Sequence, residues 1–454
     1  MTTLVKPNLD RPVASPQDLV DYLAHAAKPR ERWGIGAELE KLVVDERTGE
    51  AASFEQIERF LGSLEQSGRW QGIREEGRLI ALVGKTSSIT LEPGGQMELS
   101  GRLCPDIHCC QVDFARHIDQ VLATAKTEGL AFLGLGVQPF SPLTGIDLVP
   151  KERYGVMAPY MKRTGEMGLR MMKQTASLQV NLDFSDEADC IAKLRLSLSL
   201  APLLYALFAN SPILEGRPSG FLSTRGEIWS RTDPDRTGLI PPLFEEGAGF
   251  AAYVDWALDV PMYFIARRGT FLDMTKERFT FRRFMAEGFA GHRPLLADWD
   301  LHLSTLFPEA RLRPQIEIRS ADSLLPEQTM AMAALVKGLL YGEESRQEIW
   351  ALFRNQDAAE RDRLWRQSWR LGLKTPMGKR TLREVALEAL DIARRGLRAE
   401  RKRDAGGADE SIYLEGIEEI AESGVTLAER LLAQWTGSRR EQLATLMAHC
   451  RFGG

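Results

Sequence analysis

The sequence predicts an α+β fold built on a largely antiparallel sheet. Four short segments alternate apolar and polar residues with period two, which is typical of strands with two unlike faces. Seven other segments repeat apolar residues at helical spacing, and residues 325–454 are mostly helical by this measure. Apolar residues make up 44% and charged residues 27% of the chain, close to the average for globular proteins, so a sizeable core is expected.

The length bounds the domain organisation. At roughly 100 to 200 residues per domain, a chain of 454 residues allows two to four domains or one large one. No internal repeat, low-complexity stretch or convincing linker divides the sequence. We therefore predict one large domain over residues 1–454, with residues 325–454 as a mostly helical C-terminal region packed on it.

Charge and hydropathy exclude two classes of partner. Lys and Arg (58) nearly balance Asp and Glu (63), whereas a nucleic-acid-binding protein usually has a strong basic excess, so we expect no nucleic-acid partner. Residues 196–214 are almost wholly apolar and nearly long enough to span a bilayer, which takes about 20 residues. Because this segment contains Pro202 and Asn210 and begins beside Arg195, we predict a buried core helix and no membrane partner.

The cysteines indicate a reducing setting. There are five, an odd number without CxxC spacing, which argues against a disulfide framework and against a zinc knuckle. Residues 1–11 lack the apolar region of a signal peptide. A cytoplasmic location is the simplest expectation.

The first predicted helix has a clear start signal. Ser15 is a capping residue, Pro16 occupies the first helical position, and Asp18 closes a capping box, so a helix should run from here to about Lys28. The other predicted helices cover residues 111–128, 188–209, 326–341, 380–401, 412–422 and 427–435.

The four predicted strands turn an unusual set of side chains to one face. A polar strand face can simply meet water, but solvated faces favour Thr, Lys and Arg, whereas this set is rich in Glu, Gln and Asn. The polar positions are Glu38 and Glu40 in residues 34–42, Gln96, Glu98 and Ser100 in residues 95–100, Ser177, Gln179, Asn181 and Asp183 in residues 177–184, and Gln315, Glu317 and Arg319 in residues 313–319.

Convergence of Glu38, Glu40, Glu98 and Glu317 on one side of a curved sheet would need compensation. Two like charges about 4 Å apart repel by roughly 4 kcal/mol at an effective dielectric near 20. Either some carboxyl groups keep a proton or cations lie between them. Oxygen ligands without cysteine or clustered histidine select hard ions, and Mg²⁺ (or Mn²⁺) bridging a nucleotide phosphate is the common case, so the expected partner is Mg²⁺-ATP.

The usual nucleotide-binding loops are not present in the sequence. Residues 84–86 (Gly-Lys-Thr) resemble the end of a P-loop, but the leading glycine is replaced by Leu79. The glycine pairs in residues 34–36 and 134–136 lack the third glycine of a dinucleotide fingerprint and are more typical of strand ends or close backbone contacts. If ATP binds, we expect metals and arginines on a sheet to hold it.

Arginines for such a site occur in residues 217–236, a stretch with Pro, Gly and Ser that we interpret as a loop. Guanidinium groups bind carboxylates and phosphates with two hydrogen bonds, although the stretch can also be a surface loop with scattered charges. The six histidines are dispersed, and no Ser-His-Asp or Cys-His arrangement can be singled out. The residues of interest in this stretch are Arg217, Arg225, Trp229, Arg231 and Arg236.

At these same segments the sequence resembles the plant-type glutamate-cysteine ligases, which also occur in bacteria. The similarity covers roughly residues 30 to 380, and its motifs are long and specific. The segments that carry it are Gly-Ala-Glu-Leu-Glu at 36–40, Leu-Glu-Pro-Gly-Gly-Gln-Met-Glu-Leu-Ser-Gly at 91–101, Gln-Val-Asn-Leu-Asp-Phe at 179–184, Arg-Gly-Glu-Ile-Trp at 225–229, Asp-Arg-Thr-Gly at 235–238, His-Leu-Ser-Thr-Leu-Phe-Pro-Glu at 302–309 and Ile-Glu-Ile-Arg-Ser-Ala-Asp at 316–322.

The resemblance implies both a fold and an activity. Members have the glutamine synthetase-like carboxylate-amine ligase fold, a curved antiparallel sheet that forms a funnel surrounded by helices. They use ATP to join the γ-carboxylate of L-glutamate to the amine of L-cysteine through a γ-glutamyl phosphate, which is the first step of glutathione biosynthesis. We expect the same activity here, with ATP, L-glutamate and L-cysteine as partners and a monomer or homodimer as the assembly.

Two alternatives remain open at this point. A related ligase could use glutamate with a different acceptor amine, because the cysteine pocket is the part of the site that the sequence locates least. A non-catalytic nucleotide or metal sensor would not need an intact set of metal-binding carboxylates, which makes this alternative the weaker one.

The resemblance also implies roles for individual residues. Arg319 falls near the transferred phosphate and, with Glu317, is the expected catalytic pair, although Ser320 stands where the family leads us to expect glycine. The expected metal ligands are Glu38, Glu40, Glu92, Glu98, Gln179 and Glu317. The expected substrate-binding residues are Arg225, Trp229, Tyr263 and Arg236.

Overall fold

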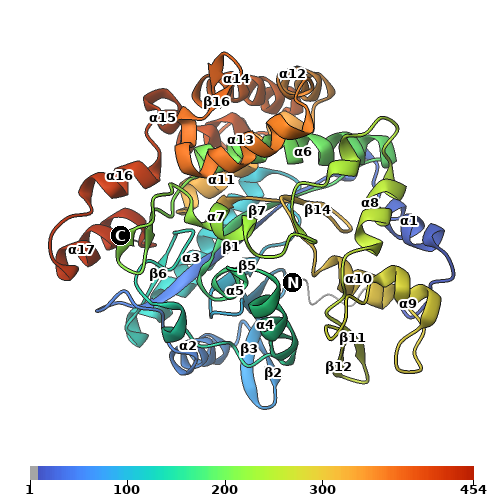
Figure 1. Cartoon of the computed structure of the whole chain (residues 1–454). Coiled ribbons are helices and arrows are strands. Elements are labelled where there is room, and N and C mark those ends of the chain that lie inside the picture. Colours follow the sequence, from blue (N-terminus) through green and yellow to red (C-terminus); the bar gives the residue numbers. More distant parts are fainter. Residues whose placement is uncertain (1–8, 454) are drawn as a thin grey trace.

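An antiparallel sheet of nine strands forms the centre of the molecule, and helices surround it (Figure 1). The structure, a computed structural model, describes residues 9–453, so most of the N-terminal segment considered above lies outside the described residues. The strands follow the order β14-β15-β7-β1-β5-β4-β3-β2, and β6 pairs with the second half of β1. Their bounds are β1 Ile35–Asp45, β2 Gln71–Glu75, β3 Arg78–Val83, β4 Ser88–Leu91, β5 Met97–Ser100, β6 Leu130–Leu133, β7 Ser177–Leu182, β14 Ala310–Leu312 and β15 Ile316–Asp322.

All four segments predicted as strands lie side by side in this sheet, as β15, β7, β1 and β5. The prediction is confirmed, although the bounds differ at the ends. The strand predicted over residues 313–319 begins only at Ile316, because Arg313 donates its backbone N–H to the carbonyl of Gln315 at 2.9 Å in the turn that precedes it. β5 begins at Met97 because Gly95, with φ of 83°, belongs to the turn before it.

Eight further strands form four two-stranded ribbons outside the main sheet. They are β8 Ile213–Leu214 with β9 Arg217–Pro218, β10 Thr237–Gly238 with β13 Phe307–Pro308, β11 Phe264–Arg267 with β12 Thr270–Asp273, and β16 Pro376–Met377 with β17 Arg380–Thr381.

The predicted helices are all present, with small shifts at their ends. α1 begins at Pro16 as expected, with the Asp18 carboxylate accepting the backbone N–H of Ser15 at 2.9 Å, but it ends at Ala24. α3 begins at Ile107, four residues earlier than predicted, because Asp106 caps it by accepting the backbone N–H of Cys109 at 2.8 Å. Residues 412–422 divide into a 3-10 turn, Glu410–Leu414, and α15.

The helices of the N-terminal and central parts are α1 Pro16–Ala24, α2 Phe54–Gln66, α3 Ile107–Glu128, α4 Glu152–Thr164, α5 Gly168–Gln174, α6 Glu187–Leu207, α7 Thr224–Ser230, α8 Phe250–Leu258, α9 Phe281–Glu287 and α10 Leu296–Leu303. The C-terminal helices are α11 Pro326–Leu340, α12 Glu343–Phe353, α13 Ala358–Leu371, α14 Leu382–Glu400, α15 Glu415–Ser423, α16 Leu427–Gln434 and α17 Arg439–Cys450.

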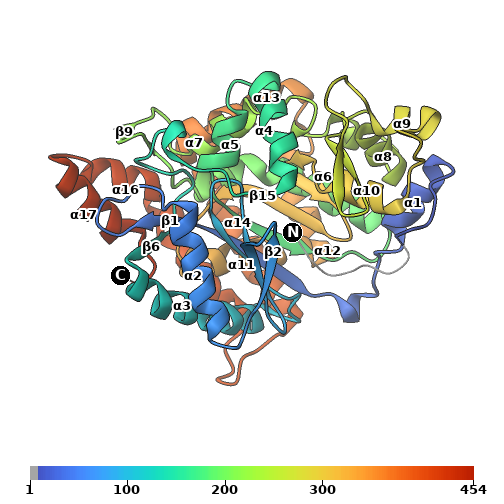
Figure 2. The ribbon, with the colours of Figure 1, turned by 90° about the horizontal axis from the view of Figure 1, so that it is seen from below.

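The two faces of the sheet are covered by different helices. Figure 2 shows α4, α5 and α7 on one side of the sheet and α2 and α3 on the other side. We call the first side the front face, which carries the polar residues of the strands, and the second side the rear face. On the rear face α11 contacts β1 and β7, and α3 contacts β1 and β6.

The apolar segment considered as a membrane span is a core helix of the fold. Among the described residues, α6 alone is long and apolar enough to cross a bilayer, but 89% of its apolar stretch is buried inside the protein. It packs against β15 and α13. Burial on all sides explains why its sequence shows no amphipathic stripe.

The C-terminal helices share the core of the rest of the chain. One connected cluster of buried apolar side chains extends from Val13 to Phe452 and includes residues of both β1 and α14. Figure 1 shows these helices, in orange and red, above the sheet and at its side.

The stretch over residues 217–236, interpreted above as a loop, contains a short helix, and that interpretation was wrong for its centre. Ser223 accepts the backbone N–H of Gly226 at 3.2 Å and thereby caps α7, which spans Thr224–Ser230. With only seven residues, α7 is too short to show helical periodicity in the sequence. Its position brings Trp229 to the front face of the sheet.

Candidate active site

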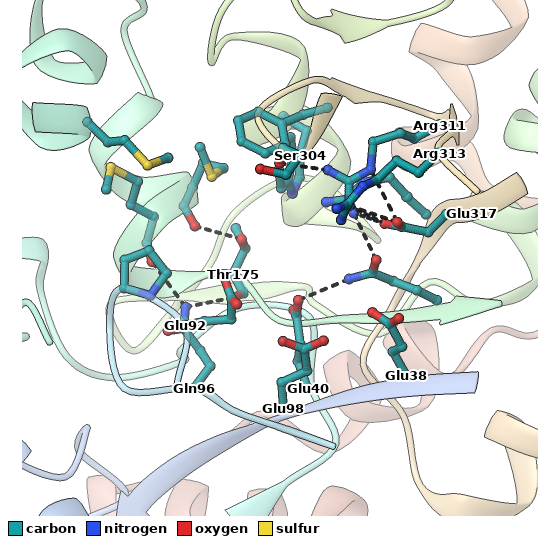
Figure 3. Close-up of a pocket in the computed structure, with 18 of the residues that line it drawn as sticks. Glu38, Glu40, Glu92, Gln96, Glu98, Thr175, Ser304, Arg311, Arg313 and Glu317 are labelled. Carbon is teal, nitrogen blue, oxygen red and sulfur yellow. Dashed lines mark hydrogen bonds and ion pairs between the residues drawn. The ribbon is translucent and has the colours of Figure 1, made fainter. Parts of the chain in front are cut away.

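A polar cavity lies on the front face of the sheet (Figure 3). It has a volume of about 300 Å³, the lower end of the range of about 300 to 1,000 Å³ typical of ligand sites. We call it the front pocket. The residues predicted from the sequence that line it are Glu38, Glu40, Glu92, Glu98, Trp229, Gln179, Glu317 and Arg319.

Strand register brings most of these side chains together. Glu40 on β1 stands directly opposite Glu98 on β5, and Glu38 stands opposite Gln179 on β7. Directly opposed residues of an antiparallel pair have Cβ atoms about 4.5 to 5.5 Å apart. Glu92 joins them from the turn between β4 and β5, where its backbone N–H donates to the carbonyl of Gln96 at 2.9 Å. Carboxylates that are 58 residues apart in sequence therefore share one surface.

Three of these carboxyl groups resist ionisation. Burial, followed by repulsion from Glu98 and Glu317, raises the pKa of Glu38 to about 8. Burial, followed by repulsion from Glu92 and Glu98, raises the pKa of Glu40 to about 8 as well. Burial and Glu98 also raise the pKa of Glu92. Among the described residues, none of these three forms an ion pair with Lys or Arg.

Glu98 and Glu40 are held by neutral donors. Glu98 accepts hydrogen bonds from the hydroxyl groups of Thr90 at 2.8 Å and Ser100 at 2.9 Å. Glu40 accepts the backbone N–H of Ser177 at 2.6 Å and the side-chain amide of Gln179 at 3.1 Å. These bonds fix the orientation of each carboxyl group.

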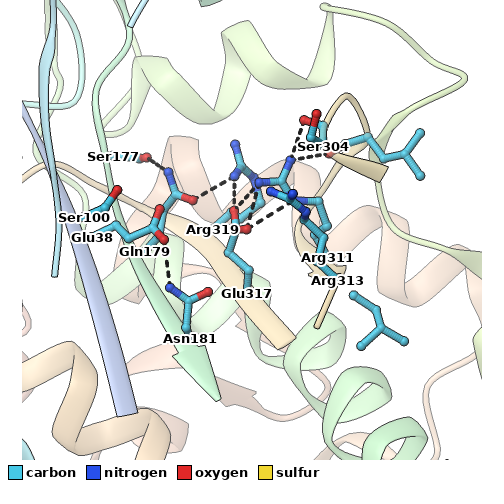
Figure 4. A network of polar contacts seen from close by, with 12 residues as sticks. Glu38, Ser100, Ser177, Gln179, Asn181, Ser304, Arg311, Arg313, Glu317 and Arg319 are labelled. Atoms are coloured by element: carbon cyan, nitrogen blue, oxygen red, sulfur yellow. Dashed lines mark hydrogen bonds and ion pairs between the residues drawn. The ribbon is translucent and has the colours of Figure 1, made fainter. Parts of the chain in front are cut away.

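Glu317 has the opposite environment (Figure 4). It faces Arg311 across the β14–β15 hairpin, and Nη2 of Arg311 donates to both of its carboxylate oxygens, at 2.7 and 2.8 Å. Arg319 also donates to Glu317, and its Nη1 donates to Oε1 of Gln179 at 2.8 Å. Burial opposes ionisation of Glu317, but the two guanidinium groups outweigh it and lower the pKa of Glu317 to about 2.

The front pocket thus has two halves of opposite charge. The carboxylate half consists of Glu38, Glu40, Glu92 and Glu98, from β1, β5 and the turn before β5. The arginine half consists of Arg311, Arg313 and Arg319, with Glu317, from β14, β15 and the turn between them. Figure 3 shows this separation, with Arg311, Arg313 and Glu317 grouped at one end.

The carboxylate half fits a divalent cation. Its donors are carboxylate oxygens, with the amide of Gln179 next to them, and hard ions such as Mg²⁺ prefer such ligands. The raised pKa values of Glu38 and Glu40 mean that, without a cation, this half keeps protons that a cation would replace.

Three of the predicted substrate-binding residues do not line the front pocket. Arg236 is fully buried and pairs with Asp233 at 2.6 Å, and its guanidinium carbon lies 4.0 Å from the ring centroid of Tyr263, so these two residues form a structural cluster beside the pocket. Neither residue lines the front pocket, and the expectation that Arg236 and Tyr263 contact substrate stays a prediction. The ion pair, in which Asp233 lies three positions before Arg236, was not considered in the sequence analysis.

Arg225 lies directly behind the pocket wall. It is 2% exposed, its guanidinium carbon is 5.5 Å from the ring centroid of Trp229, and Nη2 donates to the carbonyl of Arg319 at 3.0 Å. Its Nε and Nη1 have no hydrogen-bond partner among the described residues. Arg225 is therefore a buried guanidinium group with N–H donors that lack partners among the described residues, and Trp229 separates it from the pocket. It remains a candidate for binding an anionic substrate.

Several residues of the front pocket were missed by the sequence analysis. Arg311 is the most important, since it neutralises Glu317. The alternation of arginine with apolar residues in Arg311, Leu312 and Arg313, just before Glu317, was a usable signal for a hairpin with facing charges. The other missed lining residues are Arg153, Tyr154, Met157, Met171, Met172 and Thr175.

The glycine pairs and Ser320 have structural roles. A Cβ atom on Gly34 would lie 2.7 Å from the carbonyl oxygen of Cys104, and one on Gly134 would lie 2.5 Å from the carbonyl carbon of Leu324, so both glycines allow close backbone contacts, as predicted. Ser320, found in place of an expected glycine, is fully buried and donates to the carboxylate of Glu309 at 2.6 Å.

Comparison with known proteins places the chain among ligases. Residues 34–449 match the family described as glutamate-cysteine ligase family 2 (GCS2). The chloroplastic glutamate–cysteine ligase of Medicago truncatula is 42% identical over 424 residues, which cover 93% of this chain and 82% of that protein. The chloroplastic glutamate–cysteine ligase B of Oryza sativa subsp. japonica is 41% identical over 419 residues, covering 92% and 83% of the two chains.

A solved structure shares the fold. The glutamate–cysteine ligase of Francisella tularensis, determined in complex with AMP, superposes with a TM-score of 0.54 at 13% sequence identity, covering 92% of this chain and 88% of that one. The predicted fold class is confirmed by this likeness, with an antiparallel sheet that stays open and does not close into a barrel.

Proposed function

Because the chain belongs to glutamate-cysteine ligase family 2, we propose that it uses ATP to join the γ-carboxylate of L-glutamate to the amine of L-cysteine. This reaction is the first step of glutathione synthesis. The observation that carries the proposal beyond family membership is the front pocket itself, in which a group of carboxyl groups and a group of arginines face one another across one cavity.

The proposed reaction uses both the carboxylate half and the arginine half of the front pocket. A carboxylate is a poor acyl donor, so its γ-oxygen first attacks the terminal phosphorus of ATP, giving γ-glutamyl phosphate and ADP. Phosphoryl transfer depends mainly on positioning and on neutralising the charge of the moving group, and it requires no nucleophile from the protein. The absence of a Ser-His-Asp arrangement from the sequence motifs is therefore consistent with this chemistry.

We propose that Glu38, Glu40, Glu92 and Glu98, assisted by Gln179, hold Mg²⁺ or Mn²⁺ together with the phosphates of ATP. A divalent cation at such a site neutralises phosphate charge and orients the nucleotide. Glu317 is a further candidate, although in the structure Arg311 already donates to both of its oxygens. The AMP bound by the Francisella tularensis enzyme supports a nucleotide site in this fold.

The arginine half is suited to the transferred phosphoryl group. Arg319 is held by Glu317 and by Gln179 at 2.8 Å, and its guanidinium carbon lies 5.5 Å from the ring centroid of Trp229. A guanidinium fixed in this way presents donors to a phosphate oxygen without having to reorganise. We propose that Arg319 stabilises the charge on the transferred group and that Arg311 keeps Glu317 and Arg319 in position.

In the second step the cysteine amine attacks the carbonyl carbon of γ-glutamyl phosphate. The C–N bond forms, the C–O bond to phosphate breaks, and inorganic phosphate leaves while the amine loses a proton. Met157, Met171 and Met172 line an end of the pocket contributed by α4 and α5. This polarisable apolar surface is suited to a side chain such as that of cysteine.

Purified protein with L-glutamate, L-cysteine, ATP and Mg²⁺ should release ADP and form γ-glutamylcysteine in equal amounts. Replacing cysteine with 2-aminobutyrate and with other amines tests the choice of acceptor. ADP release that needs glutamate but is unaffected by cysteine, and that rises with another amine, would assign the related ligase with a different acceptor. Nucleotide binding with no ADP release under any of these conditions would instead indicate a sensor.

A further inference from the structure

A second cavity lies on the rear face of the sheet, between the first half of α3 and the turn that joins β3 to β4. It has a volume of about 130 Å³, and we call it the rear pocket. Leu99 of β5 contributes to its wall, whereas the neighbouring Glu98 points to the front pocket, so one strand separates the two cavities. The residues that define the rear pocket are Arg69, Lys85, Thr86, Leu99, Arg116 and His117.

The charge of the rear pocket is positive. Arg69, Lys85 and Arg116 line it, and all three are exposed at its mouth. Asp113 is its one acidic lining residue, and Nε of Arg102 donates to the Asp113 carboxylate at 2.7 Å. Neither Arg69 nor Lys85 forms an ion pair with any residue in the range 9–453. Two cationic groups are therefore available to a ligand.

A buried donor lines the same cavity. His117 of α3 is 4% exposed, and neither of its ring nitrogens has a hydrogen-bond partner among the described residues. Buried polar groups in folded proteins nearly always have partners, so a histidine without one at a cavity wall points to a ligand. Burial keeps the pKa of His117 well below its ordinary value, so the ring is neutral and offers one N–H donor.

The size of the cavity limits the ligand. A volume of about 130 Å³ is well below the range of about 300 to 1,000 Å³ for ligands of drug size, so an intact nucleotide or peptide cannot be enclosed. The hydroxyl groups of Thr86 and Ser87 add donors beside Lys85 in the turn. Cationic groups at the mouth, hydroxyls in the turn and a neutral imidazole in the wall together suit a compact oxyanion.

We propose that the rear pocket binds a small tetrahedral oxyanion, namely free inorganic phosphate or the phosphoryl group of a nucleotide whose remainder stays outside. Arg69 and Lys85 hold its charge, and His117 donates a hydrogen bond to an inner oxygen. The proposal rests on the cavity and its lining, and it does not depend on the ligase activity proposed above.

Equilibrium dialysis of the full-length protein with radiolabelled inorganic phosphate tests the proposal. Because the front pocket can also bind phosphate, the measurement is made on Arg319→Ala, which weakens that site, and on the same protein carrying Arg69→Ala and Lys85→Ala. We expect the added pair of substitutions to weaken phosphate binding by about tenfold or more, since two charge-assisted contacts are lost. Lys126→Ala, an exposed lysine on the same helix α3, should leave binding unchanged.

A third variant separates the buried donor from the surface charge. His117→Phe, checked for an unchanged melting temperature, should also weaken phosphate binding. The proposal is overturned if Arg319→Ala alone abolishes all phosphate binding, or if Arg69→Ala with Lys85→Ala binds phosphate as tightly as the protein without them. AMP added to the Arg319→Ala protein distinguishes the sources, because displacement of phosphate by AMP would assign a nucleotide and failure to displace it would assign free phosphate.

Discussion

Glu38 on β1 and Glu317 on β15 line the same pocket, yet their neighbours push their pKa values in opposite directions. Glu38 faces other carboxylates and its pKa rises to about 8, whereas Glu317 is enclosed by Arg311 and Arg319 and its pKa falls to about 2. Both lie on the polar face of a strand, so strand position alone does not decide the charge of a buried glutamate. The difference fits the proposal that the carboxylate half binds a cation from solution, whereas in the arginine half Arg311 and Arg319 pair with Glu317.

The largest effect is expected from removing one carboxylate of the carboxylate half. Glu98→Gln keeps the side-chain volume but replaces an anionic ligand with a neutral one, so turnover should fall on the order of a thousandfold. Loss of one buried charge should leave the fold intact. Steady-state ADP release measures turnover, and circular dichroism shows whether the fold is retained. Glu246→Gln, at an exposed glutamate, is the control, and normal activity of Glu98→Gln would contradict the metal assignment.

In the arginine half, removing the guanidinium group of Arg311 should affect stability as well as activity. Arg311→Ala leaves Glu317 buried with one partner fewer, and breaking a buried ion pair lowers the free energy of unfolding by about 3 to 5 kcal/mol. The midpoint of urea unfolding should fall accordingly. Arg366→Ala removes an exposed pair with Asp362 and should change the midpoint little. Equal midpoints for the two variants would show that Arg311 does not stabilise Glu317.

Substitution of Arg225 tests whether the substrate site extends from the front pocket to the space behind Trp229. Because its Nε and Nη1 lack partners among the described residues, Arg225→Ala should raise the KM for glutamate about tenfold while kcat changes less. Arg225→Lys keeps the charge but loses the planar guanidinium group. Its KM for glutamate should lie between those of the unsubstituted protein and Arg225→Ala. If glutamate saturation is unchanged in Arg225→Ala, the residue is only a packing partner of Trp229.

The smallest effect is a shift of thermal stability with pH. Glu38 and Glu40 have pKa values near 8 in the folded protein and near 4.5 when unfolded, so between these values the folded state binds more protons. Without divalent cations, the melting temperature should therefore fall by a few degrees as the pH rises from about 5 to about 8. Glu317 does not contribute in this window, because its lowered pKa matters only below pH 4.5.

Mg²⁺ should reverse this loss, raising the melting temperature more at pH 8 than at pH 6, since it binds the deprotonated carboxylates. The double substitution Glu38→Gln with Glu40→Gln should flatten both dependences. A melting temperature that rises with pH in the absence of cations would mean that these groups are ionised in the apoprotein.

Much of the site could be predicted because strand alternation is a local property. Period-two patterns alone placed Glu38, Glu40, Glu98 and Glu317 on the polar faces of their strands. In the sheet β1 and β5 are neighbours, and β7 lies between β1 and β15. What the sequence could not supply is register and tertiary contact. The pairing of Arg311 with Glu317 depends on the length of a turn, and the burial of Arg236 depends on Asp233 and Tyr263, which pack around it only in the folded chain.

The rear pocket was beyond sequence analysis for the same reason. Gly84-Lys85-Thr86 was dismissed because it fails as a P-loop, and the structure places it in a tight turn between β3 and β4. Its proposed role in phosphate binding depends on His117 and Arg69, which lie on other segments of the chain.

The most direct test is a crystal structure of the protein with Mn²⁺ and a non-hydrolysable ATP analogue, using the anomalous signal of the metal. Peaks about 2.0 to 2.3 Å from carboxylate oxygens of Glu38, Glu40, Glu92 or Glu98, next to the analogue's phosphates, are the predicted result. Bound nucleotide with manganese elsewhere, and those four carboxyl groups without a metal, would contradict the account.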